Sequence, residues 1–184
     1  MAGKKTISFT LDVDSIENAI RELRQYREDF LDKVERLRDL VAERIREDAE
    51  NGFQNALVSD VIFGEEAPND VEVEVKPGDE TTTLVIVRGS QALFIEFGAG
   101  VYHNANMLGS SLHPWVLDGT FPTYWIGGYG LRKGRRRAWG FYRDGVQDKD
   151  HLTVTRGTPA AMPLYKAVQA VVQEMDRLVM EVFG

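Results

Sequence analysis

Apolar residues recur every three or four positions near the start of the chain, which is the spacing of an amphipathic helix. The stripe runs to about Phe53 and is interrupted where Arg27 falls on it beside Tyr26; its members are Ile16, Ile20, Leu23, Phe30, Val34, Leu37, Val41, Ile45 and Ala49. This pattern predicts one long helix, or two helices with a break at the interruption, with Asp14-Ser15 as the N-cap. We expect the stripe to pack on the chain's own sheet; a coiled coil is the alternative explanation of its heptad-like spacing.

Alternating apolar and polar residues predict strands on both sides of this helix. Ile7 to Val13 alternate before it, and Val71 to Val75 and Thr83 to Val87 alternate after it, around a turn, as a hairpin. Residues 55–69, which include the apolar Val61-Ile62-Phe63, are expected to form a loop.

The second half of the chain predicts two further helices and another hairpin. Ser90 to Phe97 is expected as a short helix closed by glycine, and residues from Trp139 to Val154 as two strands joined at Asp144-Gly145. A final helix is expected from about Pro163 to Phe183, with Leu164, Val168, Val171, Met175, Leu178 and Val182 on one stripe. Residues 101–137 lack sustained periodicity and form a long irregular insertion, the kind of segment that often carries function.

This order of elements predicts an α+β fold. An antiparallel β-sheet would be packed against the long N-terminal helix and the C-terminal helix, which cover one of its sides. The 184 residues, 43% of them hydrophobic, suit a single domain spanning 1–184 with the insertion loop at about 101–137.

The charge of the chain is acidic and unevenly distributed. Lys and Arg number 22 against 29 Asp and Glu, a formal charge of -7. Residues 55–100 hold 9 acidic and 2 basic residues (−7), and residues 101–150 hold 4 and 7 (+3). The outer face of the 71–87 hairpin is the expected main source of the negative charge. Such a chain should repel nucleic acid as a whole, while its oppositely charged faces can dock onto copies of itself or onto other proteins.

Catalytic and cofactor chemistry finds little support in the sequence. The chain has no cysteine, and its three histidines, His103, His113 and His151, match no zinc spacing with Glu96 or Asp118. Phosphate-binding, dinucleotide and nucleophile-elbow motifs do not occur. We therefore expect no enzyme, no cofactor and no metal site. A signal-peptide core and a membrane-spanning apolar run are not found either, so we expect no membrane partner and no export by that route.

The sharpest local feature is a basic run with aromatic neighbours inside the insertion. It comprises Arg132, Lys133, Arg135, Arg136 and Arg137, close to Trp125, Tyr129 and Trp139. These residue types can bind a phosphate backbone and stack on bases. The acidic remainder of the chain favours the alternative, a solvated hairpin tip or a basic arm that meets an acidic protein surface.

Three stretches, in order, resemble a known family. They are Ala92-Leu93-Phe94-Ile95-Glu96-Phe97-Gly98-Ala99-Gly100, Trp139-Gly140-Phe141-Tyr142, and Thr155-Arg156-Gly157-Thr158-Pro159-Ala160-Ala161-Met162-Pro163-Leu164-Tyr165. The ordered set, together with the long charged N-terminal helix, is similar to the tail-completion, or head–tail joining, proteins of long-tailed phages and prophages, of the minor tail protein type. Ala99 stands where many members have Thr, and the insertion is longer and more aromatic than in compact members.

The resemblance implies a structural virion protein rather than an enzyme. Such a protein assembles in the host cytoplasm into a homo-hexameric ring at the phage neck, between the head-closure (connector) protein and the tail terminator or tail tube, and double-stranded DNA passes through its lumen. An acidic lining would let the DNA slide. The alternatives are a tail terminator or minor capsid component and, from another class, a nucleic-acid-binding accessory protein that acts through Arg132–Arg137.

The resemblance also assigns candidate site residues. Glu96, with Phe97, Gly98 and Gly100, would anchor the following loop by accepting backbone hydrogen bonds or an arginine fork, the alternative being a surface carboxylate on a short helix. Gly157, Pro159 and Pro163 mark the start of the last helix. Partner or subunit contacts are expected at Trp115, Trp125, Tyr129, Arg132, Lys133, Arg135, Arg136, Arg137 and Trp139, although the aromatic residues can instead fill the core.

Overall fold

One long helix, α1, organises the protein. The computed structural model describes residues 7, 10, 12–79, 81–100, 102, 113, 114, 138–142 and 147–184. Helix α1 spans Val13–Gln54, 42 residues, so it is about 63 Å long at 1.5 Å per residue. It continues through Tyr26 and Arg27, so the alternative of two helices is wrong; both side chains are exposed there, and a charge on the stripe meets water.

The start of α1 differs from the sequence prediction. The N-cap is Asp12, whose carboxylate accepts a hydrogen bond from Ser15 N at 2.9 Å, while Ser15 Oγ accepts one from Thr10 N at 2.9 Å. Asp14-Ser15 as N-cap is therefore wrong, and Val13, predicted to end a strand, is the first helical residue. The cap falls one turn earlier because Asp12 already offers the acceptor that Ser15 N–H needs. Residues 8, 9 and 11 of the predicted strand lie outside the described part of the chain.

Two antiparallel sheets are formed among the described residues. Strands β2 (Glu72–Pro77) and β3 (Thr83–Arg88) pair as the predicted hairpin, with Val73 opposite Val87. Strands β1 (Val61–Phe63), β5 (Leu152–Thr155) and β4 (Trp139–Tyr142) form a three-stranded sheet in the order β1-β5-β4. The predicted loop at 61–63 is thus wrong, since a strand of three residues is too short to show a period.

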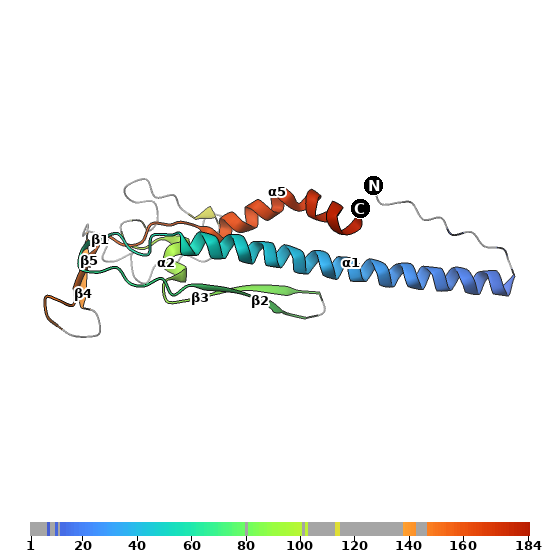
Figure 1. Ribbon diagram of the computed structural model, residues 1–184, viewed down its shortest axis with the longest axis horizontal. Coiled ribbons are helices and arrows are strands. Elements are labelled where there is room, and N and C mark those ends of the chain that lie inside the picture. Colours follow the sequence, from blue (N-terminus) through green and yellow to red (C-terminus); the bar gives the residue numbers. More distant parts are fainter. Residues whose placement is uncertain are drawn as a thin grey trace.

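Both later helices are confirmed: α2 spans Ala92–Phe97 and α5 spans Pro163–Phe183. The fold is α+β, as predicted, but the two long helices do not lie side by side on one sheet. In Figure 1, α5 lies along one side of α1 and the β2–β3 hairpin along the opposite side, while the three-stranded sheet lies beyond the C-terminal end of α1. Helix α1 is therefore the central layer of this part of the molecule.

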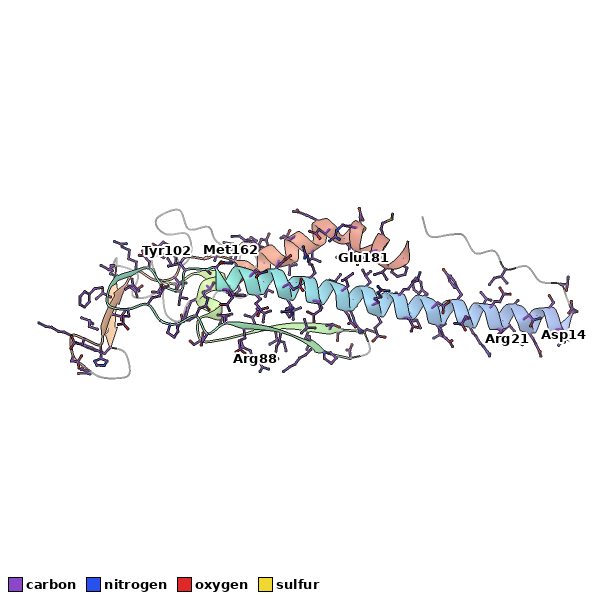
Figure 2. The ribbon with its side chains drawn as sticks, in the orientation of Figure 1. Asp14, Arg21, Arg88, Tyr102, Met162 and Glu181 are labelled. Carbon is purple, nitrogen blue, oxygen red and sulfur yellow. The ribbon has the colours of Figure 1, made fainter. Side chains whose placement is uncertain are left out.

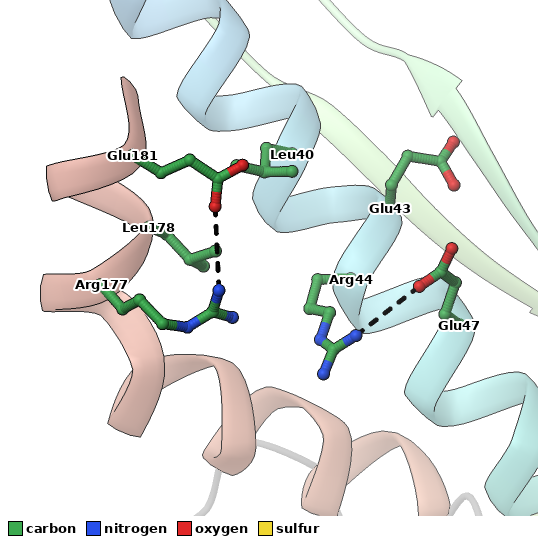
Figure 3. A pocket seen from close by; sticks show the side chains of 7 residues that line it. All are labelled: Leu40, Glu43, Arg44, Glu47, Arg177, Leu178 and Glu181. Atoms are coloured by element: carbon green, nitrogen blue, oxygen red, sulfur yellow. Dashed lines mark ion pairs between the residues drawn. The ribbon is translucent and has the colours of Figure 1, made fainter. Parts of the chain in front are cut away.

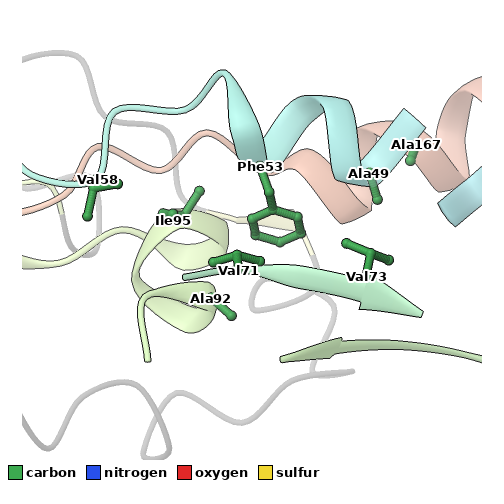
Figure 4. Close-up of a cluster of buried hydrophobic side chains, with 8 residues drawn as sticks. All are labelled: Ala49, Phe53, Val58, Val71, Val73, Ala92, Ile95 and Ala167. Carbon is green, nitrogen blue, oxygen red and sulfur yellow. The ribbon is translucent and has the colours of Figure 1, made fainter. Parts of the chain in front are cut away.

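The main core forms where the last turns of α1 meet the hairpin and both later helices. Its buried members are Ala49, Phe53, Val58, Val71, Val73, Ala92, Ile95 and Ala167 (Figure 4). Helix α5 runs antiparallel to α1: Pro163 lies against Gly52 at one end, and the ring of Phe183 lies 5.8 Å from that of Phe30 at the other.

The N-terminal part of α1 extends beyond this packing. We call residues 13–36 the α1 arm; every residue from Ile20 to Arg36 is exposed. The stripe packs within the chain from Leu37 onward, as expected. In the arm, Phe30 contacts Phe183 of α5, but for the stripe residues before Phe30 the expectation is wrong. The reason is length: α5 ends at Phe183 beside Phe30, and the hairpin reaches only to Asp39, which accepts a hydrogen bond from Thr83 Oγ1. No helix among the described residues is long and apolar enough to cross a membrane.

The core position of Phe53 gives a direct test of this packing. Its side chain is 1% exposed between α1, β2 and α2, whereas Phe63 on β1 is 56% exposed. We expect Phe53→Ala to lower the free energy of unfolding by about 3 to 5 kcal/mol, since it leaves a cavity in the core. Phe63→Ala is the matched control and should cost less than about 1 kcal/mol. Chemical denaturation of the two variants measures this; equal losses would contradict the packing.

Candidate functional site

The carboxylate of Glu96 joins the end of α2 to the start of α5. Its side chain is buried, with the residue 4% exposed, and it accepts hydrogen bonds from Leu164 N at 2.9 Å and Tyr165 N at 3.0 Å. His113 Nε2 lies 2.8 Å from Glu96 Oε1, placed to donate a third. The ring of His113 also packs between Phe97 and Tyr165, with centroids at 4.5 and 5.3 Å. Glu96 therefore binds the first turn of the last helix and also contacts His113 of the insertion, so it is not a surface carboxylate.

The start of α5 explains why this carboxylate is needed. Pro163 is the first helical residue and has no N–H, and the N-cap residue, Met162, offers no side-chain acceptor. The N–H groups of Leu164 and Tyr165 therefore have no acceptor at the start of α5 itself. Glu96, on α2, accepts a hydrogen bond from each of them. The positive end of the α5 dipole further favours a negative charge at this point. Met162 itself adopts the left-handed conformation (φ 56) in order to turn the chain into the helix.

Two of the family-like stretches meet at this point. Ala99 N donates to Thr158 O at 2.8 Å, and Ala161 N donates to Ile95 O at 2.9 Å. Backbone hydrogen bonds thus join residues 95–99 to residues 157–161. Gly157 has φ 120, and a Cβ there would collide with the carbonyl oxygen of Ala99. Gly98 and Gly100 also have positive φ values, 79 and 68. We call this contact, with Glu96 at its centre, the α2–α5 joint.

A second polar cluster fastens β1 and β5 to residue 102. Asp60 accepts hydrogen bonds from Tyr102 Oη at 2.5 Å and from Arg156 Nη1 at 3.2 Å. The tyrosine hydroxyl, and next the arginine, hold the pKa of Asp60 below its ordinary value, and the same hydrogen bond raises the pKa of Tyr102. Nothing in the local sequence pattern pointed to Asp60 or Tyr102, because the partners lie 42 and 96 residues from Asp60 along the chain.

Several carboxylates of the acidic middle segment also accept hydrogen bonds within the chain. Glu66 accepts from Val58 N and Ser59 N, both at 3.0 Å, and Asp70 accepts from Ser90 N at 2.8 Å, which lowers the pKa of Asp70. By contrast, residues 72–88 hold four acidic and two basic residues, −2 of the −7. Within the hairpin, Arg88 and Lys76 both pair with Glu74. The expectation that the hairpin carries most of the negative charge is therefore wrong.

Most of the predicted partner-contact residues lie outside the described part of the chain. These are Trp115, Trp125, Tyr129, Arg132, Lys133, Arg135, Arg136 and Arg137. Trp139 is described through its backbone, as the first residue of β4 opposite Thr155. Of the histidines, His113 meets Glu96, whereas His151 pairs with Asp148 at 2.7 Å near the start of β5. No group of three or more His, Asp and Glu that could hold a metal is found among the described residues.

A small charged cavity lies between α1 and α5 (Figure 3). Its volume is about 210 Å³, and it is lined by Leu40, Glu43, Arg44, Glu47, Arg177, Leu178 and Glu181. Arg44 lies 3.8 Å from Glu47 and 3.9 Å from Glu174, so ion pairs span the cavity edges. Binding pockets for small molecules are larger and mostly apolar. This cavity is a solvated gap between helices, and the α2–α5 joint remains the most organised polar site of the described residues.

Comparison of the chain with protein-family models, with curated proteins and with solved structures finds no match.

The α2–α5 joint should dominate local stability. Glu96→Gln keeps the size of the side chain but turns one of its two acceptor oxygens into a donor that faces the N–H of either Leu164 or Tyr165. We therefore expect the free energy of unfolding to fall by about 3 kcal/mol. Glu22→Gln, on the exposed arm, is the matched control and should change the free energy of unfolding by less than about 0.5 kcal/mol. Equilibrium denaturation measures both. A Glu96→Gln protein as stable as the control would remove the anchoring role.

The Asp60–Tyr102 contact should appear in the pH dependence of stability. Because the pKa of Asp60 is lowered on folding, its contribution is full above the unfolded value of about 3.9 and is lost as the pH falls through the folded value. Because the pKa of Tyr102 is raised, its contribution is full below about 10 and is lost as the pH rises through the folded value. Tyr102→Phe should therefore cost about 1 kcal/mol between pH 5 and 9, and less outside that window. A cost that does not vary between pH 2 and pH 11 would contradict this.

Proposed function

We propose that this chain is a structural virion protein of a phage neck or tail. In this role it forms a ring that joins the head-closure protein to the tail terminator or tail tube and lets double-stranded DNA pass. The observation that carries the proposal is the α2–α5 joint. The two stretches with the strongest family resemblance, 92–100 and 155–165, are 55 residues apart along the chain, counting from residue 100 to residue 155. They nevertheless make one hydrogen-bonded unit around Glu96.

The form of the molecule supports an assembly role over catalysis. Figure 2 places Asp14 and Arg21 on the projecting end of α1, far from Arg88, Tyr102 and Met162 on the body. The protein is thus elongated, with much of its apolar and charged surface available for contacts with other subunits. The buried carboxylate of Glu96 and the half-buried carboxylate of Asp60 accept hydrogen bonds from backbone and side-chain donors of the same chain. Such networks position segments, and they leave little of these carboxylates free for a substrate.

The charge distribution fits a ring through which DNA passes, although the 71–87 hairpin is not the main source of the negative charge as the sequence analysis expected. Because Asp60, Glu66, Asp70 and Glu96 accept hydrogen bonds within the chain, the acidic excess stabilises loops as well as making the protein anionic. A weakly anionic lumen would not retain the DNA backbone. A subunit interface of the heterologous kind closes such a ring when its rotation closes.

Assembly of the purified full-length chain tests the proposal. We expect light scattering to give a mass of several times 20.8 kDa, and electron microscopy to show rings with a central hole. A compact monomer that binds double-stranded DNA tightly at physiological salt would overturn the proposal. It would favour a nucleic-acid-binding accessory protein, whose binding should then vanish in the variant Arg135→Ala, Arg136→Ala, Arg137→Ala.

A further inference from the structure

The exposed face of the α1 arm carries a heptad seam. With a and d as the core positions, Val13, Ile20, Arg27, Val34 and Val41 occupy a, and Ile16, Leu23, Phe30 and Leu37 occupy d. β-branched residues at a, with Leu or another large apolar residue at d, make a two-helix seam. Val13 is 71% exposed and Leu23 55% exposed, so the arm presents this seam to solvent.

The side of α1 that carries Phe30 is already covered by a helix farther along α1. Helix α5 covers it antiparallel from Pro163, beside Gly52, to Phe183, beside Phe30. Figure 3 shows Leu178 of α5 facing Leu40 of α1 within this contact. N-terminal to Phe30, the described residues provide no helix to continue the coverage. The open part of the seam begins where α5 ends, and a second antiparallel helix would extend the existing contact without displacing anything.

We propose that the arm pairs with the arm of a second copy, antiparallel, over residues 13–30. In this register, residues whose numbers add up to 43 meet in the seam. Val13 lies against Phe30 of the second copy, next to its Phe183, and Ile20 lies against Leu23. The two-fold symmetry repeats each contact, as an isologous dimer requires. Arg27 meets Ile16 and can extend its guanidinium along the seam toward the acidic end of the other arm.

Charges at the edges of the seam select this register. On one edge Glu17 lies opposite Arg24 of the second copy, and on the other Asp12 lies opposite Lys33, so symmetry gives four opposite-charge pairs. The ammonium of Lys33 already lies 5.8 Å above the ring of Phe183, at the point that the second arm would reach. Tyr26 falls opposite Ala19, a large residue against a small one.

The parallel in-register arrangement is disfavoured by the same residues. It would place Arg27 against Arg27 inside the seam, Asp12 near Glu17, and Lys33 near Arg38, all of them like-charge contacts. Sliding the antiparallel pair by one heptad brings Arg24 opposite Arg24. The same slide would also need the seam beyond Phe30, which α5 occupies. A slide of one heptad in the other direction brings Glu17 opposite Glu17.

The expected pairing is reversible. The overlap of 18 residues is about 27 Å long, so the contact falls near the lower end of specific interfaces, about 1,000 Å². This inference does not depend on the proposed function. If the chain also forms rings through other surfaces, arm pairing doubles the mass of whatever the body forms.

Charge reversal across one edge is the sharpest experiment. Sedimentation equilibrium of the full chain between about 1 and 200 µM should show wild-type pairing in the micromolar range. Glu17→Arg alone and Arg24→Glu alone each turn two attractive pairs into repulsive ones, and each should weaken pairing about tenfold. The double variant Glu17→Arg, Arg24→Glu should restore wild-type affinity. Restoration is the result that a merely destabilised helix would not give.

Two further experiments test whether the apolar residues of the seam are required for pairing and whether the two arms run antiparallel. Leu23→Asp should abolish pairing, while Val172→Asp, on an exposed α5 residue, should leave it unchanged. Because the chain has no cysteine, a mixture of Ile16→Cys and Arg27→Cys proteins should form a mixed disulfide under mild oxidation. A strictly unpaired wild type, pairing that survives Leu23→Asp, or an Arg27→Cys protein that crosslinks chiefly to itself would each overturn the proposal.

Discussion

The contact between the Glu96 carboxylate and the first turn of α5 is the interaction on which the arrangement depends. A helix that begins with Pro163 after Met162 has no local acceptor for its next N–H groups, so its start must lie where another element supplies one. Glu96 supplies it from α2, which the core residues Ile95 and Ala92 hold against α1. This fixes the origin of α5 beside Gly52, and antiparallel packing then brings its end to Phe30. The length of the arm left uncovered follows from these two points.

The acidic composition has a structural explanation that net charge alone does not reveal. Carboxylates in this chain repeatedly accept backbone N–H groups at the ends of elements: Asp12 at α1, Glu66 after α1, Asp70 before α2 and Glu96 at α5. Each of these contacts gives a main-chain N–H the acceptor that water would otherwise supply. Part of the acidic excess therefore consists of carboxylates that hold loops and helix starts in place.

The sequence predicted the elements with long or regular patterns and missed those set by distant partners. The 3.6-residue period gave α1 and α5, and strict alternation gave the β2–β3 hairpin. Strand β1 was missed because Val61–Phe63 pairs with residues more than 90 positions away, and three residues carry no period. The cluster of Asp60 with Tyr102 was missed for the same reason. The apolar stripe of α1 does not predict which turns of the helix are buried, because burial depends on where α5 begins and ends.

The difference in length between the two long helices has a physical consequence. Helix α1 has 42 residues and α5 has 21, so α5 can cover only half of its partner. The arm nevertheless stays helical, because it propagates from turns that the core has already nucleated, and adding a residue to an existing helix costs little. An arm that were merely solvated would need only polar residues. Here the core positions of the seam leave Val13, Ile16, Ile20 and Leu23 between 37% and 71% exposed. Each therefore lacks part of the stabilisation of about 1.5 to 3 kcal/mol that full burial would give. A sequence that places a regular apolar seam directly beyond the end of its own covering helix is suited to a second helix at that position.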